Sequence, residues 1–333
     1  MSRRAALLRT VGIPLACLVA GGAAGYRLHD ARARGPGHSF SERREGGHRY
    51  VNPLLECDAG PALLGDELTP FRSRVEGFLR DELRYPGVEG VSVYFRELND
   101  GLWFSLGEAE RYTPASLRKV PMMIAVLKQA ERTPGLLQAK LPFLLANDHN
   151  AEQTFKPSVT LVRGQEYTVA ELVRRMIVYS DNNAFMLLSA TVNRAELERT
   201  YEKLDLRAPG SGAAPEVSAE TYASFFRVLY NASYLPRELS EWALSLLAES
   251  EFHDGIVRGL PPGVPVAHKF GESRDDATGE VQLHDCGVVY LPDRPYLLCV
   301  MTRGTSFEYL DDAIAAVSRI VHDEVTAQRA PRR

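Results

Sequence analysis

The chain has 333 residues, of which 45% are hydrophobic and 25% are charged, and its formal net charge is −4. This composition is that of a globular protein with enough sequence to bury a large core. The charge is small and no basic stripe is interleaved with aromatic residues, so the sequence argues against nucleic acid as a partner.

The first 27 residues differ from the rest of the chain. A basic start, MSRRAALLRT, precedes the apolar and small residues VGIPLACLVAGGAAG at 11–25. A basic segment followed by an apolar run too short for a comfortable bilayer span predicts an export signal or membrane anchor at 1–27. Residues 28–62 are interpreted as a linker, and a globular domain is predicted at 63–327. We therefore expect an exported protein, periplasmic or at the cell surface, that meets a membrane only through its N-terminal segment.

Beyond the linker, strand patterns enclose a helical region. FRSRVEGFLRDEL has helical spacing, and alternating stretches on either side of residues 99–101 predict a strand, a turn and a strand. Helical patterns follow in the middle of the chain, three strand patterns lie within 264–304, and an amphipathic helix closes the chain at 306–325. This order predicts an α/β fold with one antiparallel sheet built from both chain ends and flanked by helices, and an inserted all-helical lobe.

Cys286 and Cys299 flank a hairpin pattern centred near Pro292 and Asp293. The two cysteines could face each other across the strands, but two buried free thiols are the favoured interpretation, and the number of cysteines outside the export segment is odd. No cysteine or histidine has the spacing of a metal site, and no cofactor is expected.

Three short motifs occur in order along the predicted domain. PASLRKVPMM (114–123) contains a serine and a lysine three residues apart at the start of a helical pattern. VYSDNNA (178–184) lies between two helical patterns, and VAHKFGE (266–272) lies on a late strand. Each is the only match of its kind in the chain, so the ordered set is a stronger signal than any member alone.

The first motif has a chemical explanation. Residues three apart share a face of a helix, so Lys119 can contact Ser116, whose hydroxyl is a weak nucleophile without a base. Burial and the neighbouring charge of Lys269 would lower the pKa of Lys119, and its neutral amine could then take the serine proton. Pro121 predicts that the first turn is set off from the rest of the helix. In the structural alternative, Ser116 is a simple N-cap and the Lys119 side chain extends to solvent. Residues 180–182 would then form an ordinary turn between helices, and Lys269 would be a surface lysine.

Together the motifs resemble S-x-x-K, S-D-N and K-T-G, the signature of class A β-lactamases and penicillin-binding proteins, over roughly residues 63–327. The resemblance implies a β-lactamase-like fold and four catalytic residues. Ser116 would be the nucleophile and Lys119 its base. Ser180 would relay a proton to the leaving nitrogen, and Lys269 would supply positive potential.

The resemblance also implies residues that bind substrate. Asn182 would hold an amide of the substrate, Gly271 would lie on the substrate-binding strand, and the backbone N–H groups of Ser116 and Glu272 would form an oxyanion hole. Phe270 departs from the motif because it has no hydroxyl to grip a carboxylate, and Glu272 adds negative charge. We expect Phe270→Thr to raise acylation by carboxylate-bearing substrates. Four basic side chains could compensate in the native chain: Arg274, Arg303, His268 and His284.

A second departure concerns the loop that carries the deacylating glutamate in class A β-lactamases. In EKLDLRAPGSGAAPEVSAETY (202–222), Ala208 lies where the acid is expected, and Glu216 fits better at the start of the next helix. A missing general base typically costs ~10²–10⁴-fold in rate, so deacylation is expected to be slow.

Three functions remain open on the sequence alone. The first is a class A β-lactamase-family serine hydrolase that is acylated at Ser116 and opens β-lactam rings. The second is a penicillin-binding or D,D-peptidase-type enzyme that acts on peptidoglycan peptides. The third is a weakly catalytic module that binds or senses cell-wall fragments. The expected partner in each case is a small β-lactam or a peptidoglycan peptide.

Overall fold

The computed structural model describes residues 41–58, 68–82, 87–99, 101–203 and 216–329. The predicted export segment at 1–27 and the loop position Ala208 lie outside these residues. Residues 42–57 and 65–333 form one compact unit, and the structure described below is that of this unit.

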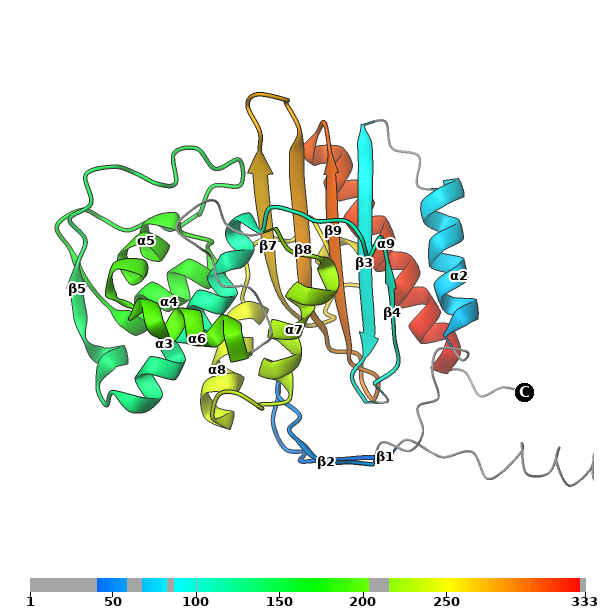
Figure 1. Ribbon diagram of the computed structural model, residues 1–333, viewed down its shortest axis with the longest axis horizontal. Helices are drawn as coiled ribbons and strands as arrows, with labels where there is room; N and C mark the ends of the chain where they lie inside the picture. Colours follow the sequence, from blue (N-terminus) through cyan, green and yellow to red (C-terminus); the bar gives the residue numbers. More distant parts are fainter. Residues whose placement is uncertain (1–40, 59–67, 83–86, 100, 204–215, 330–333) are drawn as a thin grey trace, which may run out of the picture. The chain divides into compact units, whose positions relative to one another are not determined.

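A five-stranded antiparallel sheet lies at the centre of the unit, with the strand order β4-β3-β9-β8-β7. Two strands come from the first part of the domain and three from its end (Figure 1). Their bounds are β3 Val88–Glu97, β4 Trp103–Leu106, β7 Val266–Arg274, β8 Val281–Val289 and β9 Tyr296–Gly304. The two ends of the domain therefore share one sheet, as the sequence predicts.

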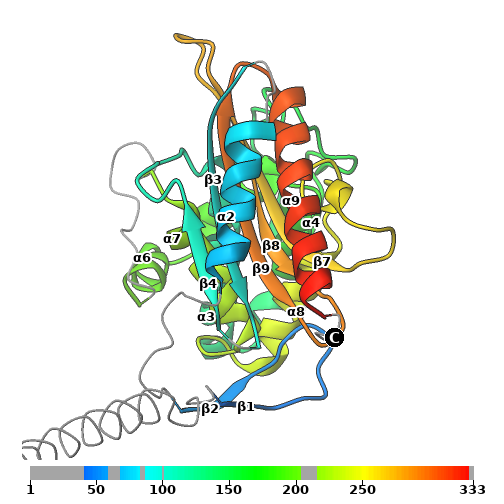
Figure 2. The same ribbon diagram turned by 90° about the vertical axis from the view of Figure 1, so that its right-hand side faces the viewer.

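Helices cover both faces of the sheet. α2 (Thr69–Gly77) and α9 (Phe307–Arg329) pack on one face, as Figure 2 shows. The other face meets the helical lobe, whose members are α3 Lys119–Arg132, α4 Val169–Val178, α5 Asn182–Thr191, α6 Arg194–Lys203, α7 Ala219–Tyr230 and α8 Arg237–Ala248. Each face has its own apolar cluster, because successive strand residues point to opposite sides of the sheet. The predicted fold class is confirmed.

Shorter elements complete the unit. The small strand pairs are β1 Ser41–Arg44 with β2 Leu54–Asp58 and β5 Lys140–Pro142 with β6 Glu166–Thr168. Single helical turns occur at η1 Phe78–Glu82, η2 Ala115–Arg118, η3 Leu136–Gln138 and η4 Val257–Gly259. Within the described ranges, no helix is both long enough and apolar enough to cross a membrane.

Side-chain caps explain where two of the lobe helices begin. At α4, the Thr168 hydroxyl accepts the N–H of Glu171, and the Glu171 carboxylate accepts the N–H of Thr168. At α7, Ser218 is the N-cap and Glu220 lies in the first turn. Glu216 therefore precedes the helix and does not begin it, which corrects the expectation for that residue.

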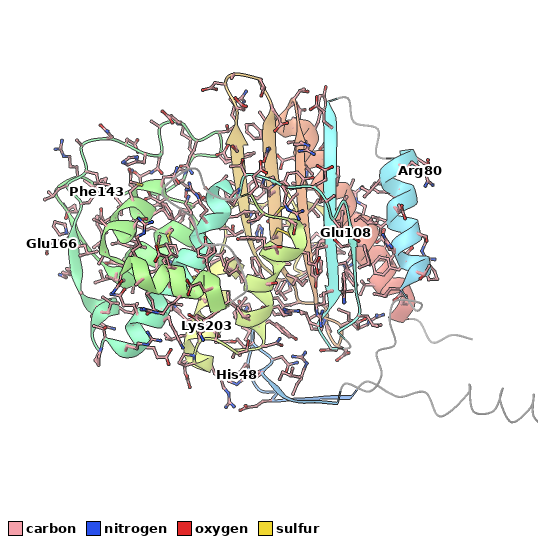
Figure 3. All side chains as sticks on the ribbon, viewed as in Figure 1. His48, Arg80, Glu108, Phe143, Glu166 and Lys203 are labelled. Carbon is pink, nitrogen blue, oxygen red and sulfur yellow. A yellow bond between two sulfur atoms is a disulfide. The ribbon has the colours of Figure 1, made fainter. Side chains whose placement is uncertain are left out.

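Part of the predicted linker belongs to the compact unit. The carboxylate of Glu241, on α8, accepts three consecutive backbone N–H groups, from Arg49, Tyr50 and Val51, at 2.8–3.1 Å. Figure 3 labels His48 on the segment that makes this contact. The folded unit thus includes residues before the predicted domain start at 63. The Glu241 carboxylate accounts for this, because it accepts hydrogen bonds from backbone N–H groups of residues 49–51.

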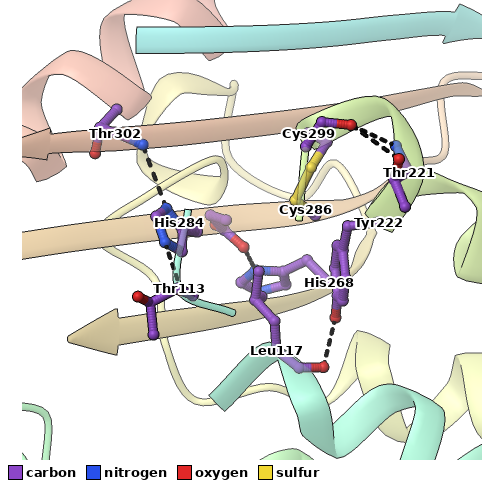
Figure 4. Close-up of a disulfide and its surroundings, with 11 residues drawn as sticks. Thr113, Leu117, Thr221, Tyr222, His268, His284, Cys286, Cys299 and Thr302 are labelled. Atoms are coloured by element: carbon purple, nitrogen blue, oxygen red, sulfur yellow. Dashed lines mark hydrogen bonds and ion pairs between the residues drawn. A yellow bond between two sulfur atoms is a disulfide. The ribbon is translucent and has the colours of Figure 1, made fainter. Parts of the chain in front are cut away.

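Cys286 and Cys299 form a disulfide, which corrects the prediction of two free thiols. The residues lie directly opposite each other on β8 and β9, and both side chains are fully buried (Figure 4). Lys269 lies opposite Cys286 on the next strand. The disulfide therefore joins two central strands beside the strand that carries the third motif.

Candidate active site

Ser116 lies in η2, a single turn that is separate from α3. Pro121 is the third residue of α3, where a backbone N–H has no partner within the helix, so the proline is tolerated there. Ala115 has a φ of +46°, in the left-handed region that non-glycine residues rarely adopt. The buried Tyr222 hydroxyl donates to the Leu117 carbonyl at 3.0 Å, as Figure 4 shows, and anchors the turn.

β7 passes close beneath this turn because residue 271 is glycine. A Cβ at Gly271 would lie 2.9 Å from Leu117 Cγ and 3.0 Å from the Pro114 carbonyl oxygen. Any side chain would push the turn and Ser116 away from the strand. Gly271, predicted as a substrate-binding residue, therefore sets the distance between the serine and β7.

Four predicted side chains come together between the turn, the lobe and β7. Lys119 Nζ lies 3.0 Å from Ser116 Oγ and 2.9 Å from Ser180 Oγ. Lys269 Nζ lies 3.0 Å from the same Ser180 Oγ. Ser116, Lys119, Ser180 and Lys269 are called the lysine cluster below, and their catalytic roles stay predictions.

Both lysines of the cluster are buried, with Lys119 2% and Lys269 0% exposed. Burial, reinforced by the charge of Lys269, holds the pKa of Lys119 well below its ordinary value of 10.5. Burial also lowers the pKa of Lys269 to about 7, against the opposing charges of Asp285 and Glu272. A neutral amine at Lys119 can accept a proton, and Lys269 can be charged or neutral near pH 7.

Ser180 is held in an unusual backbone conformation just before α5. Its φ is +56°, and its carbonyl accepts from Lys119 Nζ at 2.6 Å. The next residue, Asp181, caps α5 by accepting the N–H groups of Asn183 and Ala184. Backbone strain of this kind gathers at functional sites, and here both Ala115 and Ser180 carry it.

Asn182 lies at the start of α5, beside the cluster but not bonded to it among the described contacts. Its Nδ2 donates to the carbonyl of His149 at 3.0 Å, and its backbone N–H donates to Asn150 Oδ1 at 2.7 Å. The carboxamide is therefore fixed in orientation before any ligand arrives.

The remaining residues of the third motif pack differently from the expectation. The Glu272 carboxylate accepts the backbone N–H groups of Thr154 and Phe155 at 3.0–3.1 Å, so its charge is engaged by donors. Phe270 is buried and stacks on Phe252, with the ring centroids 4.2 Å apart. Lys269 Nζ lies 4.0 Å from the centroid of the Phe270 ring. The aromatic face thus contacts the lysine where the family motif has a hydroxyl.

Three of the four basic residues proposed to compensate are not available for a carboxylate. His268 is bonded to Asp285 at 2.8 Å, and Arg303 is ion-paired with Glu110. Burial lowers the pKa of His284 to about 4, so this side chain is neutral at physiological pH. Arg274, at the end of β7, is exposed, whereas the Arg303 side chain is partly buried.

Sequence reasoning missed Gln153, whose Nε2 donates to the Ser180 carbonyl at 3.0 Å. The residue belongs to a polar stretch, NDHNAEQ, that has no helical or strand period. Its distance along the chain from the second motif is fixed by no local rule, so only the polar character of the stretch could have drawn attention to it.

This arrangement suits acyl transfer. One hydroxyl faces a neutral amine, and a second hydroxyl lies between two amines, so protons can move from Ser116 to Lys119 and through Ser180 to a leaving group. In the part of the chain that the structure describes, no three His, Cys, Asp or Glu side chains are grouped as a metal site would require.

Comparison with known proteins adds a family and several structural relatives. The model of the beta-lactamase enzyme family matches residues 75–325. The TLA-3 extended-spectrum beta-lactamase is 19% identical with a TM-score of 0.68, and 77% of this chain and 98% of that chain are covered. The class A beta-lactamase from Mycobacterium abscessus is 22% identical with a TM-score of 0.62, over 76% and 98% of the two chains.

A third solved structure, PBP-A, is 20% identical with a TM-score of 0.64, and 78% of this chain and 97% of that chain are covered. At these identities the likeness concerns the fold. A search of curated protein sequences found no match.

Proposed function

Because the chain belongs to the beta-lactamase enzyme family, we propose that it is a serine hydrolase that is acylated at Ser116 and opens β-lactam rings. One observation carries the proposal above all others. The continuous contacts from Ser116 Oγ to Lys119 Nζ, Ser180 Oγ and Lys269 Nζ, at 3.0, 2.9 and 3.0 Å, form a path for protons between two hydroxyls and two amines.

Acylation begins with the neutral amine of Lys119. It takes the proton of the Ser116 hydroxyl while Oγ attacks the carbonyl carbon of the ring amide. The new C–O bond converts the carbonyl oxygen to an oxyanion, which faces the backbone N–H groups of Ser116 and Glu272. When the C–N bond breaks, Ser180 gives its proton to the leaving nitrogen and regains one from Lys119. The products are an opened ring and an ester at Ser116.

Deacylation is proposed to be the slow step. Among the described residues, no carboxylate is hydrogen-bonded to Ser116 or Lys119. Water that attacks the ester without a positioned base reacts ~10²–10⁴-fold more slowly than water with one. The segment in which the family carries its deacylating acid includes Ala208, which lies outside the described residues.

The same observation supports a second candidate, a penicillin-binding or D,D-peptidase-type enzyme acting on peptidoglycan peptides. A solved structure of a PBP-A point mutant is an acyl-enzyme complex with penicillin G, and its fold matches this chain with a TM-score of 0.65. An enzyme of this kind would hold a β-lactam as a lasting adduct. We place either activity outside the cytoplasm, on the basis of the predicted segment 1–27 and the disulfide.

A chromogenic β-lactam separates these functions. The purified protein is incubated with the compound while ring opening is followed by absorbance and the adduct by intact mass. Continuous ring opening supports the hydrolase, and a persistent adduct that Ser116→Ala abolishes supports the peptidase-type enzyme. Ser189→Ala is the matched control, because that hydroxyl is bonded to the Phe185 carbonyl on α5. With neither ring opening nor adduct, acylation is refuted and the cell-wall-sensing module remains.

A further inference from the structure

A loop of the helical lobe contacts β7, an edge strand of the sheet, beside the lysine cluster. This bridge loop, residues 150–158, is fastened to β7 by Glu272, whose carboxylate accepts the backbone N–H groups of Thr154 and Phe155. The Phe155 ring packs edge-on against Phe270, with centroids 5.7 Å apart. Figure 1 shows the green segment after β5 reaching toward β7. The position of the loop relative to the sheet is thus fixed by charge and by aromatic packing.

Gln153 immediately precedes the fastened residues and contacts the lysine cluster. Its Nε2 and Lys119 Nζ donate to the same oxygen, the Ser180 carbonyl, at 3.0 and 2.6 Å. Its Oε1 is buried and has no hydrogen-bond partner among the described residues. Burial of the Oε1 atom without a partner is unfavourable. The hydrogen bond from Nε2 to the Ser180 carbonyl is therefore the polar contact that favours the buried position of the Gln153 amide.

The Ser180 carbonyl needs support because its residue is in a strained conformation. A φ of +56° is unfavourable for serine, and relaxation of the backbone would turn the carbonyl away from Lys119. A second donor, fixed on a loop that is anchored elsewhere, opposes that relaxation. Gln153 is such a donor.

We propose that Gln153 is a positioning residue for acylation: it holds the Ser180 carbonyl, and this carbonyl directs the amine of Lys119 toward Ser116. The inference rests on the proposed function, because acylation is the step whose rate Gln153 would set. None of the three motifs contains this residue, and its effect is exerted through the backbone of Ser180.

The surroundings of Lys119 provide a readout that a purely structural role would not move. Burial dominates its pKa, and four charged groups face the amine, two that lower the pKa and two that raise it: Lys269 and Arg118, Asp181 and Glu272. The amide of Gln153 points the positive end of its dipole at the carbonyl that Lys119 shares. Without this amide, the carbonyl oxygen is left to stabilise the ammonium form, and the pKa of Lys119 rises.

The test compares Gln153→Leu and Gln153→Glu with the native protein. Single-turnover acylation by a chromogenic β-lactam is measured across about pH 5 to 10, with the half-saturating concentration determined separately. Gln153→Leu should slow acylation about tenfold without changing half-saturation, and move its acidic limb to higher pH. Gln153→Glu, which cannot donate to the carbonyl and adds a negative charge, should move that limb further.

Ser158→Ala is the matched control. Its hydroxyl donates to the Glu251 carboxylate at the other end of the bridge loop, and its removal changes no charge. This variant should keep the native rate and pH profile. Native kinetics in both Gln153 variants, or an equal loss in Ser158→Ala, would overturn the proposal.

A second measurement does not need acylation. The Cε resonance of Lys119 is titrated by NMR in ¹³C-lysine-labelled native protein and in Gln153→Leu, without substrate. A raised pKa in the variant supports the link between Gln153 and Lys119, and an unchanged pKa refutes that link. If the native protein shows no acylation but the pKa rises in the variant, the proposed function fails and the positioning of Lys119 by Gln153 stands.

Discussion

His268 and Lys269 are neighbours on β7, both are buried, and both carry a basic group, yet their environments differ. His268 Nδ1 lies 2.8 Å from Asp285 Oδ1, and the other carboxylate oxygen accepts the backbone N–H of Ile256 at 2.9 Å. Lys269 has no carboxylate within hydrogen-bond distance among the described residues. Its partners are the Ser180 hydroxyl, the Phe270 carbonyl and the Phe270 ring.

The contrast separates a basic group that stabilises the fold from one that is available for chemistry. A buried base matched by an acid is satisfied, and it has little to offer a ligand. A buried lysine that is hydrogen-bonded only to neutral groups has a lowered pKa, even with carboxylates farther away, and it attracts an anion that can supply the missing charge. Because strand residues alternate between faces, one dipeptide presents both kinds of site.

The largest expected effect is on stability, and it comes from the loss of the His268–Asp285 pair. Asp285→Ala leaves His268 and the Ile256 N–H without their buried partner, and removal of one member of a buried pair costs about 3–5 kcal/mol. We expect the free energy of unfolding to fall by that amount in denaturant titrations. Because the charge of Asp285 raises the pKa of Lys269, its loss should also lower that pKa further and slow acylation by an anionic β-lactam at pH 7, by a smaller factor than loss of Lys269 itself. A native acylation rate at pH 7 in well-folded Asp285→Ala would show that the charge of Asp285 does not influence Lys269.

On the lysine side, Lys269→Met should reverse this pattern. Acylation by an anionic β-lactam should fall about 10²–10³-fold, since the positive group facing the site is gone. Stability should rise, because a buried amine that favours its neutral form is replaced by an apolar side chain. Single-turnover kinetics and denaturant titrations, done on the same samples, give both numbers.

The stability gain of Lys269→Met should depend on pH in a defined direction. The folded pKa of Lys269 is about 7, below its ordinary value of 10.5, so between these values the unfolded native chain binds more protons than the folded one. Native stability therefore rises with pH across this window, by at most about 1.4 kcal/mol per pH unit from this group. The advantage of the methionine variant should shrink from pH 7 toward pH 10. A constant advantage would mean that the lysine pKa is not lowered.

Phe270→Thr is expected to have the smallest net effect on acylation. Loss of the ring from its contacts with Phe252 and Lys269 should destabilise the fold by about 2–4 kcal/mol. The introduced hydroxyl should raise acylation by carboxylate-bearing substrates relative to uncharged ones. The ratio of the two acylation rates, measured below the unfolding temperature, is the decisive quantity, and an unchanged or lower ratio would contradict the role assigned to position 270.

Local sequence rules anticipated the features that depend on short spacings. Ser116 and Lys119 are three residues apart and their side chains are in contact. The strand patterns around residue 100 and after residue 264 predicted the strands of the sheet. The disulfide was within reach of the same reasoning, because Cys286 and Cys299 are equally distant from the turn at Pro292 and Asp293. An odd number of cysteines argued against it, but pairing depends on strand register and not on the count.

Contacts between distant segments could not be anticipated in this way. Gln153 meets Ser180, and Glu272 meets Thr154, through the folding of a loop that has no period. Glu241 binds a segment that reads as a linker because its own residues are polar and rich in glycine. In each case a side chain forms a hydrogen bond with a backbone group far away in sequence. Local propensities of the residues do not predict such contacts.

The buried disulfide gives the molecule a dependence on its folding history. Both sulfur atoms lie in the centre of the sheet, fully shielded from solvent, so neither oxidants nor reductants reach them once the strands have packed. A sample folded under reducing conditions and one folded under oxidising conditions are therefore two long-lived species with the same sequence. They differ one strand away from Lys269, and batches prepared in different cellular compartments should not be compared until their thiols have been counted.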